Sequence, residues 1–166
     1  MTYHGSRIPT SFGSLNNTFS FKNISLTALI AYRFGYYFRA NSIDYNVLVR
    51  QGVGHSDYYN RWQKPGDEKI TNIPSFRYPV NTSATTFYTF SSPLVEKGDN
   101  IRLQFVHLNY EMNRQTLKAL PFQKINLYVN ISDIGIIWRA NKKGIDPDNQ
   151  GIKTPTRYAG GLNFTL

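Results

Sequence analysis

The amino-acid sequence predicts an all-β protein made of about five antiparallel strands that follow one another in hairpins. First, several segments alternate apolar and polar residues, which is the period of a strand with one apolar face. Second, the connections between these segments are alternately short and long. Short turns on one side and long loops on the other are typical of an outer-membrane β-barrel, whereas a soluble sandwich has no reason to separate them. Third, no stretch reaches the ~18 consecutive apolar residues of a membrane helix, so only strands could cross a membrane.

The first two strands are predicted over residues 16–22 and 24–39, with a tight turn at Lys22–Asn23. Apolar side chains occupy every even position from Ile24 to Phe38. The second strand is longer than the ~9–11 residues that cross a bilayer at a tilt. Its aromatic residues concentrate at the far end, where a barrel carries an interfacial girdle.

Three further strands are predicted over residues 101–113, 123–138 and 156–166. In the first of them, the apolar positions change from odd to even. Either a β-bulge near Phe105–Val106 reconciles the two halves, or one half lies outside the buried zone. A second phase change is expected around Gly135. A short connector over residues 114–122, broken by Pro121, joins the third strand to the fourth.

Two long segments, about 40–98 and 139–155, are predicted to be external loops of the barrel. The first contains residues 61–76, RWQKPGDEKITNIPSF, which show neither a helical nor a strand period. Pro65, Gly66 and Asp67 predict a tight turn there. The segment is rich in Tyr, Phe, Trp and Arg, which argues against disorder.

An aromatic cluster next to this turn is the candidate contact surface for a ligand or a partner. Aromatic rings stack on sugar faces while neighbouring polar groups bond hydroxyls, so rings next to Arg and Asn suit a binding surface. The residues with this character are Tyr58, Tyr59, Asn60, Arg61 and Trp62. The alternative is that these rings pack the loop onto the barrel rim or onto a partner protein.

Composition narrows the range of functions. A chain of 166 residues is one domain by length, and the absence of cysteine removes disulfides, thiolate metal sites and cysteine nucleophiles. The formal charge of +9 suggests an acidic partner or an anionic surface. The Lys and Arg residues are scattered, however, and the longest basic cluster is the short run 139–143. The N-terminus lacks the apolar core of a signal peptide.

The sequence predicts no enzyme, no cofactor and no metal site. His4, His55 and His107 are far apart and lack metal-ligand spacing. The run 146–151 has the acidic start of a calcium loop but not the acidic residue required at its end, so it is interpreted as a turn. Asp67 and Glu68 could be imagined as a glycosidase pair, but adjacent acids beside Pro-Gly are interpreted as a solvated turn.

Three motifs resemble the C-terminal end of the SusC/RagA family of TonB-dependent outer-membrane transporters of Bacteroidetes. They are RWQKPGDEKITNIPSF at 61–76, VEKGDNIRLQFVHLNYEMNR at 95–114 and IGIIWRANKKGIDPD at 134–148. The resemblance extends over most of the chain. It implies a large plugged barrel of about 22 strands, of which this chain supplies roughly the last five and is incomplete as a barrel.

The resemblance also implies a function, in which the whole protein imports glycan oligomers or peptides across the outer membrane. Energy comes from the TonB complex through an N-terminal part, and a SusD-like surface lipoprotein covers the outer side. We expect the signal peptide, plug and TonB box to be absent here, and the chain to be a fragment that is inactive alone. Barrels of this kind end in an assembly signal, which would be Tyr158, Leu162, Phe164 and Leu166 here, with Leu where an aromatic residue is usual.

Two other functions remain open at the level of sequence. A soluble β-sandwich carbohydrate-binding module predicts apolar strand faces that pack on one another. A basic nucleic-acid-binding β domain predicts a continuous Lys/Arg stripe and salt-dependent binding.

Overall fold

The computed structural model describes residues 2–113, 121, 123–151 and 153–165. The chain forms two compact units. We call Ile8–Tyr36 with Gly98–Leu166 the strand unit, and Met1–Arg7 with Tyr37–Lys97 the loop unit.

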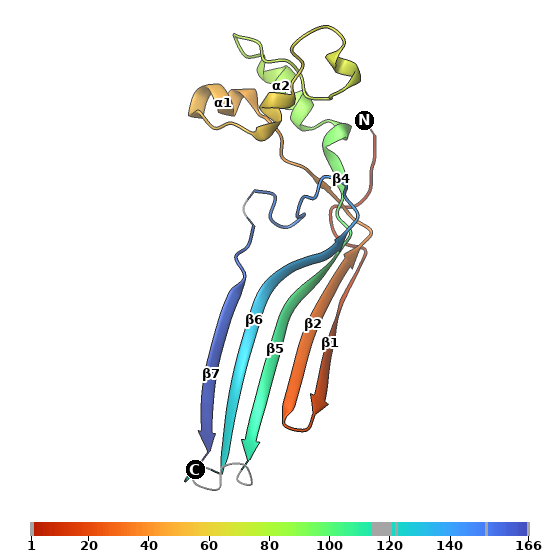
Figure 1. Cartoon of the computed structure of the whole chain (residues 1–166). Coiled ribbons are helices and arrows are strands. Elements are labelled where there is room, and N and C mark those ends of the chain that lie inside the picture. Colours follow the sequence, from red (N-terminus) through yellow and green to blue (C-terminus); the bar gives the residue numbers. More distant parts are fainter. Residues whose placement is uncertain (1, 114–120, 122, 152, 166) are drawn as a thin grey trace. The chain divides into compact units, whose positions relative to one another are not determined.

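The strand unit is one five-stranded antiparallel sheet in the order β1-β2-β5-β6-β7 (Figure 1). Its strands are β1 (Ser11–Phe21), β2 (Ile24–Phe34), β5 (Asn100–Asn113), β6 (Lys124–Arg139) and β7 (Arg157–Thr165). Each strand pairs with the strands next to it in sequence order, and β1 and β7 are edges, so the sheet does not close into a barrel. The predicted all-β fold, an incomplete part of a barrel wall, is confirmed. Because these five strands form one layer, the described residues of the strand unit contain no second sheet of the kind that a sandwich packs on the first.

The tight turn between β1 and β2 lies where it is predicted, at Lys22–Asn23. Lys22 has a φ of 52°, in the left-handed region that a two-residue hairpin turn uses. The Asn23 side chain donates to the carbonyl oxygen of Glu111 at 2.7 Å, and the Glu111 amide donates back to the Asn23 carbonyl at 2.8 Å. These bonds tie the turn to the neighbouring strand β5.

The predicted strand over residues 24–39 is wrong at its far end, because β2 stops at Phe34. Gly35 has a φ of 75°, which strands do not use. The Asp99 carboxylate accepts hydrogen bonds from the Gly35 amide at 2.7 Å and the Tyr36 amide at 3.4 Å. The apolar alternation continues through this break, so the sequence pattern does not reveal it. At the other end of the hairpin, β1 begins at Ser11 rather than at residue 16, because residues 11–15 pair with β2 although few of them are apolar.

The predicted bulge in β5 is confirmed and lies at Gln104. Leu103 and Phe105 pair with adjacent β2 residues, so Gln104 has no partner in that ladder. The bulge places Leu103 and Val106 on the same face although their positions differ in parity. The expected phase change in β6 is also present, with positive φ angles at Asp133 and Gly135. Of the predicted connector, residues 114–120 and 122 lie outside the described residues.

The loop unit has a hydrophobic core of its own. Its elements are β3 (Tyr37–Arg39), α1 (Tyr45–Gln51), the 3₁₀ helices η1 (Ser56–Asn60), η2 (Asp67–Lys69) and η3 (Ser92–Leu94), α2 (Thr82–Thr89) and β4 (Val95–Lys97), which pairs with β3. Ile43, Tyr45, Tyr88 and Leu94 form the buried centre. The segment predicted as one loop therefore contains helices, which are too short to give a clear helical period.

Each α-helix is capped by a neighbouring side chain. Asp44 accepts hydrogen bonds from the amides of Asn46 and Val47 at the start of α1, and Asn81 accepts from the Ala84 amide at the start of α2. None of the helices in the described part of the chain combines the length and apolar composition needed to cross a membrane.

Candidate functional site

One face of the sheet is apolar and uncovered. The register of the strands places the following side chains on it, each between 38 % and 73 % exposed: Leu15, Phe19, Phe21, Ile24, Leu26, Leu108, Leu127, Val129 and Leu162. An apolar patch of this extent marks a surface that meets a partner or a lipid phase.

Aromatic side chains lie at both ends of this apolar face. At the end where β2 stops, the Phe34 ring centroid is 5.3 Å from that of Tyr32 and 6.1 Å from that of Trp138. At the end with the tight turn, Phe21 and Tyr110 are exposed on the same face. Between the two ends, most side chains on this face are aliphatic, and Asn17 and Phe19 of β1 are exceptions.

The opposite face of the sheet is mainly polar, although it also carries Phe12, Leu29 and Phe105. It presents Ser14, Asn16, Thr18, Ser25, Thr27, His107, Asn109, Asn126, Tyr128, Asn130 and Asn163. The Thr18 and Thr27 hydroxyls are 2.8 Å apart, and the His107 ring stacks on Tyr128 with centroids 5.8 Å apart. The two faces therefore differ in chemistry along the same strands, as they do when one faces an apolar phase and the other faces water or protein.

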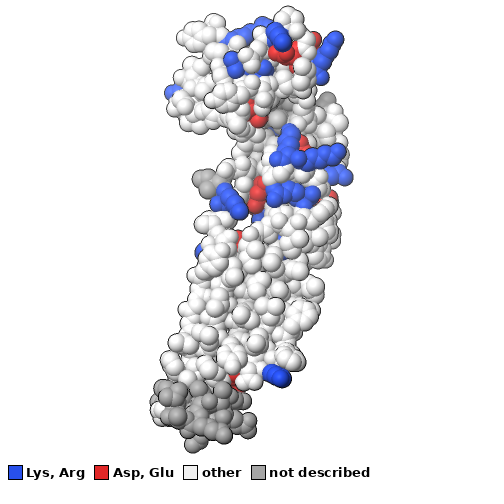
Figure 2. Space-filling view, in the orientation of Figure 1, with Lys and Arg blue, Asp and Glu red and all other residues white. Residues whose placement is uncertain are grey.

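Charge is distributed unevenly over the surface. Figure 2 shows a long surface along the strands on which blue Lys and Arg atoms are sparse. The continuous basic stripe that a nucleic-acid-binding domain predicts does not run along this visible face of the strands.

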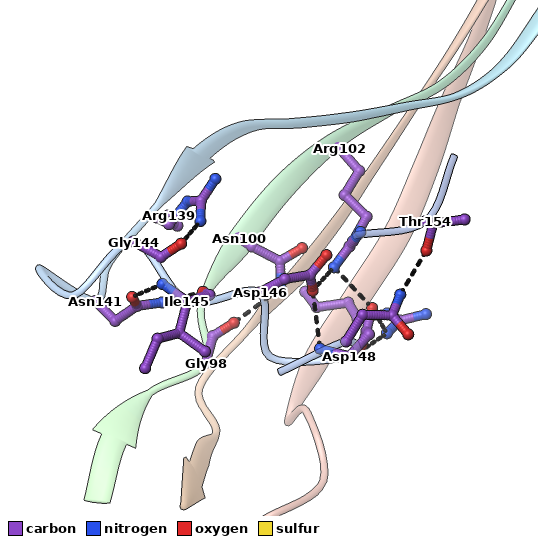
Figure 3. Close-up of polar contacts among 12 residues, drawn as sticks. Gly98, Asn100, Arg102, Arg139, Asn141, Gly144, Ile145, Asp146, Asp148 and Thr154 are labelled. Atoms are coloured by element: carbon purple, nitrogen blue, oxygen red, sulfur yellow. Dashed lines mark hydrogen bonds and ion pairs between the residues drawn. The ribbon is translucent and has the colours of Figure 1, made fainter. Parts of the chain in front are cut away.

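The loop between β6 and β7 is fastened to the sheet by ion pairs (Figure 3). Arg102 of β5 contacts Asp146 and lies 3.0 Å from an Asp148 oxygen. Arg33 of β2 donates to both oxygens of Asp148, at 2.8 and 2.9 Å. Asn141 closes the start of the loop with two hydrogen bonds to Ile145, each 2.9 Å long. We call the four charged residues Arg33, Arg102, Asp146 and Asp148 the loop latch.

The ion pairs and hydrogen bonds of the loop latch shift the pKa of Asp146, one of its carboxylates. Burial by itself would raise the pKa of Asp146, but the Arg102 hydrogen bond and the Asp148 amide together hold it below its ordinary value. Burial and then the charge of Asp148 raise the pKa of Tyr36, whose hydroxyl accepts a hydrogen bond from the fully buried Asn100 at 2.8 Å. The run 146–151 is thus held in an ion-paired turn. Among the described residues, no three His, Asp or Glu side chains gather as a metal site would require.

The aromatic cluster predicted as a contact surface is largely engaged within the loop unit. Tyr58 packs against the buried core, and the Arg61 guanidinium lies 3.9 Å from the centroid of its ring. The Trp62 indole nitrogen donates to the Thr71 carbonyl oxygen at 2.5 Å. Tyr59 is 80 % exposed. Of this cluster, Tyr59 and Asn60 are exposed, and the half-buried Trp62 lines a groove of the loop unit.

The predicted Pro65–Asp67 turn has the geometry of a tight turn. Gly66 has a φ of 101°, and the Asp67 carboxylate accepts hydrogen bonds from the amides of Gln63 and Lys64. These two bonds lower the pKa of Asp67. The Glu68 carboxylate accepts a hydrogen bond from the Gly66 amide at 2.8 Å. Both acids are therefore bonded to the turn backbone.

Of the predicted assembly signal, Tyr158, Leu162 and Phe164 lie on the apolar face and are more than half exposed. Leu166 lies outside the described residues.

The loop latch could not be predicted from the sequence, because its arginines stand on strands and its aspartates on a loop far along the chain. The polar positions of Arg33 and Arg102 within apolar strands are the only sequence signal for it.

No protein-family model and no curated protein matches the sequence. Solved structures do match. Chains in the structures of the RagAB peptide importer in its open-open and closed-closed states each align over 98 % of this chain with a TM-score of 0.64 and 20 % identity. A chain of the RagAB peptide transporter aligns over 87 % with a TM-score of 0.53 and 21 % identity. The chain spans 18 % of the length of the first two and 16 % of the third, and at this identity the similarity shows the fold.

Proposed function

We propose that this chain is part of the wall of a TonB-dependent outer-membrane transporter of the SusC/RagA type. The observation that carries the proposal is the two-faced sheet, with an uncovered apolar face, aromatic residues at both of its ends and a polar opposite face. Lipid would contact the apolar face, and the polar face would line the interior of the barrel.

The dimensions of the strands support a membrane position. Strand β2 has 11 residues. At ~3.3 Å per residue it is about 36 Å long, and at a tilt of about 40° it spans roughly 28 Å. The apolar band of an outer-membrane barrel is about 25 Å tall.

The open edges support a larger barrel. β1 and β7 each have one side without a neighbouring strand in the sheet. Each unpaired backbone group in hydrocarbon costs several kcal/mol, so both edges need partner strands in the membrane. Those strands would come from the rest of the barrel.

The proposed cargo is a peptide, and the alternative cargo is a glycan oligomer. The similarity to chains of a peptide importer supports the first choice. A SusD-like lipoprotein would cover the outer side, the TonB complex would supply energy, and no catalytic step or cofactor takes part.

Uptake by living cells tests the proposal. A strain that lacks the gene is compared with its parent and with a complemented strain, using fluorescein-labelled oligopeptides and fluorescein-labelled maltooligosaccharides. We expect loss of peptide uptake alone. Loss of sugar uptake alone would identify a glycan, instead of a peptide, as the cargo. Unchanged uptake of both would overturn the transport function.

A further inference from the structure

The loop unit contains a groove of about 1070 Å³ that the proposed function does not yet use. Residues from the chain start, β3, α2 and the aromatic loop surround it. The basic and aromatic side chains in its lining are His4, Arg39, Trp62, Phe87, Tyr88 and Phe90. Ligand pockets in proteins commonly measure about 300–1000 Å³, so this groove has room for a short oligopeptide.

Aromatic rings give the groove an apolar surface. Phe87 is 79 % exposed and Phe90 is 65 % exposed, although both stand on or beside a helix whose other side faces the buried core. Tyr88, between them in sequence, is buried and bonds the Ser42 hydroxyl at 2.7 Å. The helix thus has a fixed inner side and presents its phenyl rings outward, where they are available to a ligand.

The charge of the groove has one sign. The Arg39 guanidinium lies 4.4 Å from the centroid of the Phe90 ring, which fixes a cation at the apolar surface. His4 lies nearby in the lining, with Nε2 3.0 Å from the Ser92 hydroxyl oxygen. None of the described residues that line the groove is Asp or Glu. A ligand that fits this surface combines apolar side chains with a carboxylate.

We propose that this groove binds an oligopeptide that carries aromatic or aliphatic side chains and a carboxylate, with Arg39 as the carboxylate partner. The inference rests on the proposed transport function, and it names the class of peptide and where it binds. A neutral glycan matches the groove less well, because it offers no charge to Arg39.

Tryptophan fluorescence provides the test, because the chain has only two tryptophans, Trp62 and Trp138. In the complete protein that carries this chain, in detergent micelles, the part of the emission change that Trp62→Phe removes reports binding at the wall of the groove, and Trp138→Phe is the control. The probes are acetyl-Ala-Phe-Ala-Phe-Asp with an amidated C-terminus, the same peptide with the aspartate side chain replaced by the asparagine amide, and maltoheptaose. We expect a saturable change in Trp62 emission with the acidic peptide and about tenfold weaker binding of the amide, which is the effect of one charge-assisted hydrogen bond.

Matched variants identify the groove. Arg39→Gln should remove the preference for the acidic peptide, and Phe87→Ser should weaken both peptides. Arg50→Gln changes an arginine in the last turn of α1 that does not line the groove, and it should leave binding unchanged. Circular dichroism establishes that each variant is folded. Equal binding of acid and amide, a preference for maltoheptaose, or no saturable signal would overturn the inference.

The outcomes also separate the two proposals. If the deletion strain loses peptide uptake while Arg39→Gln leaves the acid preference intact, transport stands and the groove assignment fails. If the groove binds the acidic peptide but uptake is unchanged in the deletion strain, the transport function fails and the groove assignment stands.

Discussion

Replacing Leu108 with arginine should destabilise the protein strongly in a bilayer and only weakly if this surface faces water. Leu108 lies on the apolar face near the middle of β5 and is 44 % exposed. If this surface faces water, the substitution removes only about half of the ~1.5–3 kcal/mol that a fully buried leucine contributes, so the protein loses about 1 kcal/mol of stability. In hydrocarbon, an arginine on the lipid side of a barrel costs about 2–4 kcal/mol at the midplane.

The matched control is Asn109→Arg, one residue further along the strand. Asn109 is less exposed than Leu108 but lies on the polar face. We expect this change to cost less than about 1 kcal/mol, because lumen positions accept charge. The assay is urea unfolding, in phosphatidylcholine vesicles, of the complete protein that carries this chain, followed by the shift between folded and unfolded bands on a gel. A larger loss for Asn109→Arg than for Leu108→Arg would refute the assignment of the faces.

Three further results are expected. The chain has no cysteine, so single cysteines can be introduced and labelled with bimane. Brominated lipid should quench the label at positions 103 and 106 but not at 105. Quenching at 103 and 105 but not at 106 would contradict the bulge at Gln104. Asn100→Ala should lower the free energy of unfolding by about 1–3 kcal/mol, because it removes a fully buried amide that donates to the Tyr36 hydroxyl and to the Gly98 carbonyl. Urea unfolding measures this loss, with Asn17→Ala at an exposed position as the control. A transition shifted no further than that of the control would contradict the prediction. The pKa of Asp146 is lowered on folding, so its contribution to the latch is present above the ordinary carboxylate pKa of ~3.9 and is lost as the pH falls through its folded value. A spin label at Lys142→Cys should therefore become mobile as the pH falls through the lowered pKa of Asp146, and at neutral pH in the Asp146→Asn background. A label that stays immobile in both would disprove the latch.

The strand pattern was predictable because strand periodicity is local. Alternating residues from Ile24 onward reveal a two-faced strand whatever its neighbours are. The bulge near Phe105 was also predictable, since one extra residue in a strand shifts the apolar positions from odd to even. The break after Phe34 was not, because it depends on the Asp99 carboxylate, which is distant in the chain.

The candidate contact residues show the same limit. The sequence groups Tyr58, Arg61 and Trp62 by adjacency, but it does not say which side chains the core of the loop unit takes up. The structure packs Tyr58 inward and bonds Trp62 to Thr71. It brings Arg39 and Phe90 together although they are far apart in sequence. Such neighbours are set by the return of the chain through β3 and β4, which no local pattern encodes.

By itself, the sequence determined that this protein is an antiparallel sheet with one apolar and one polar face, because side-chain alternation is fixed by the geometry of a single strand. Only the tertiary structure decided that the apolar face stays uncovered, that two arginines of the strands hold two aspartates of a distant loop, and that an aromatic groove with a single sign of charge exists. Those features depend on contacts between segments far apart in the chain.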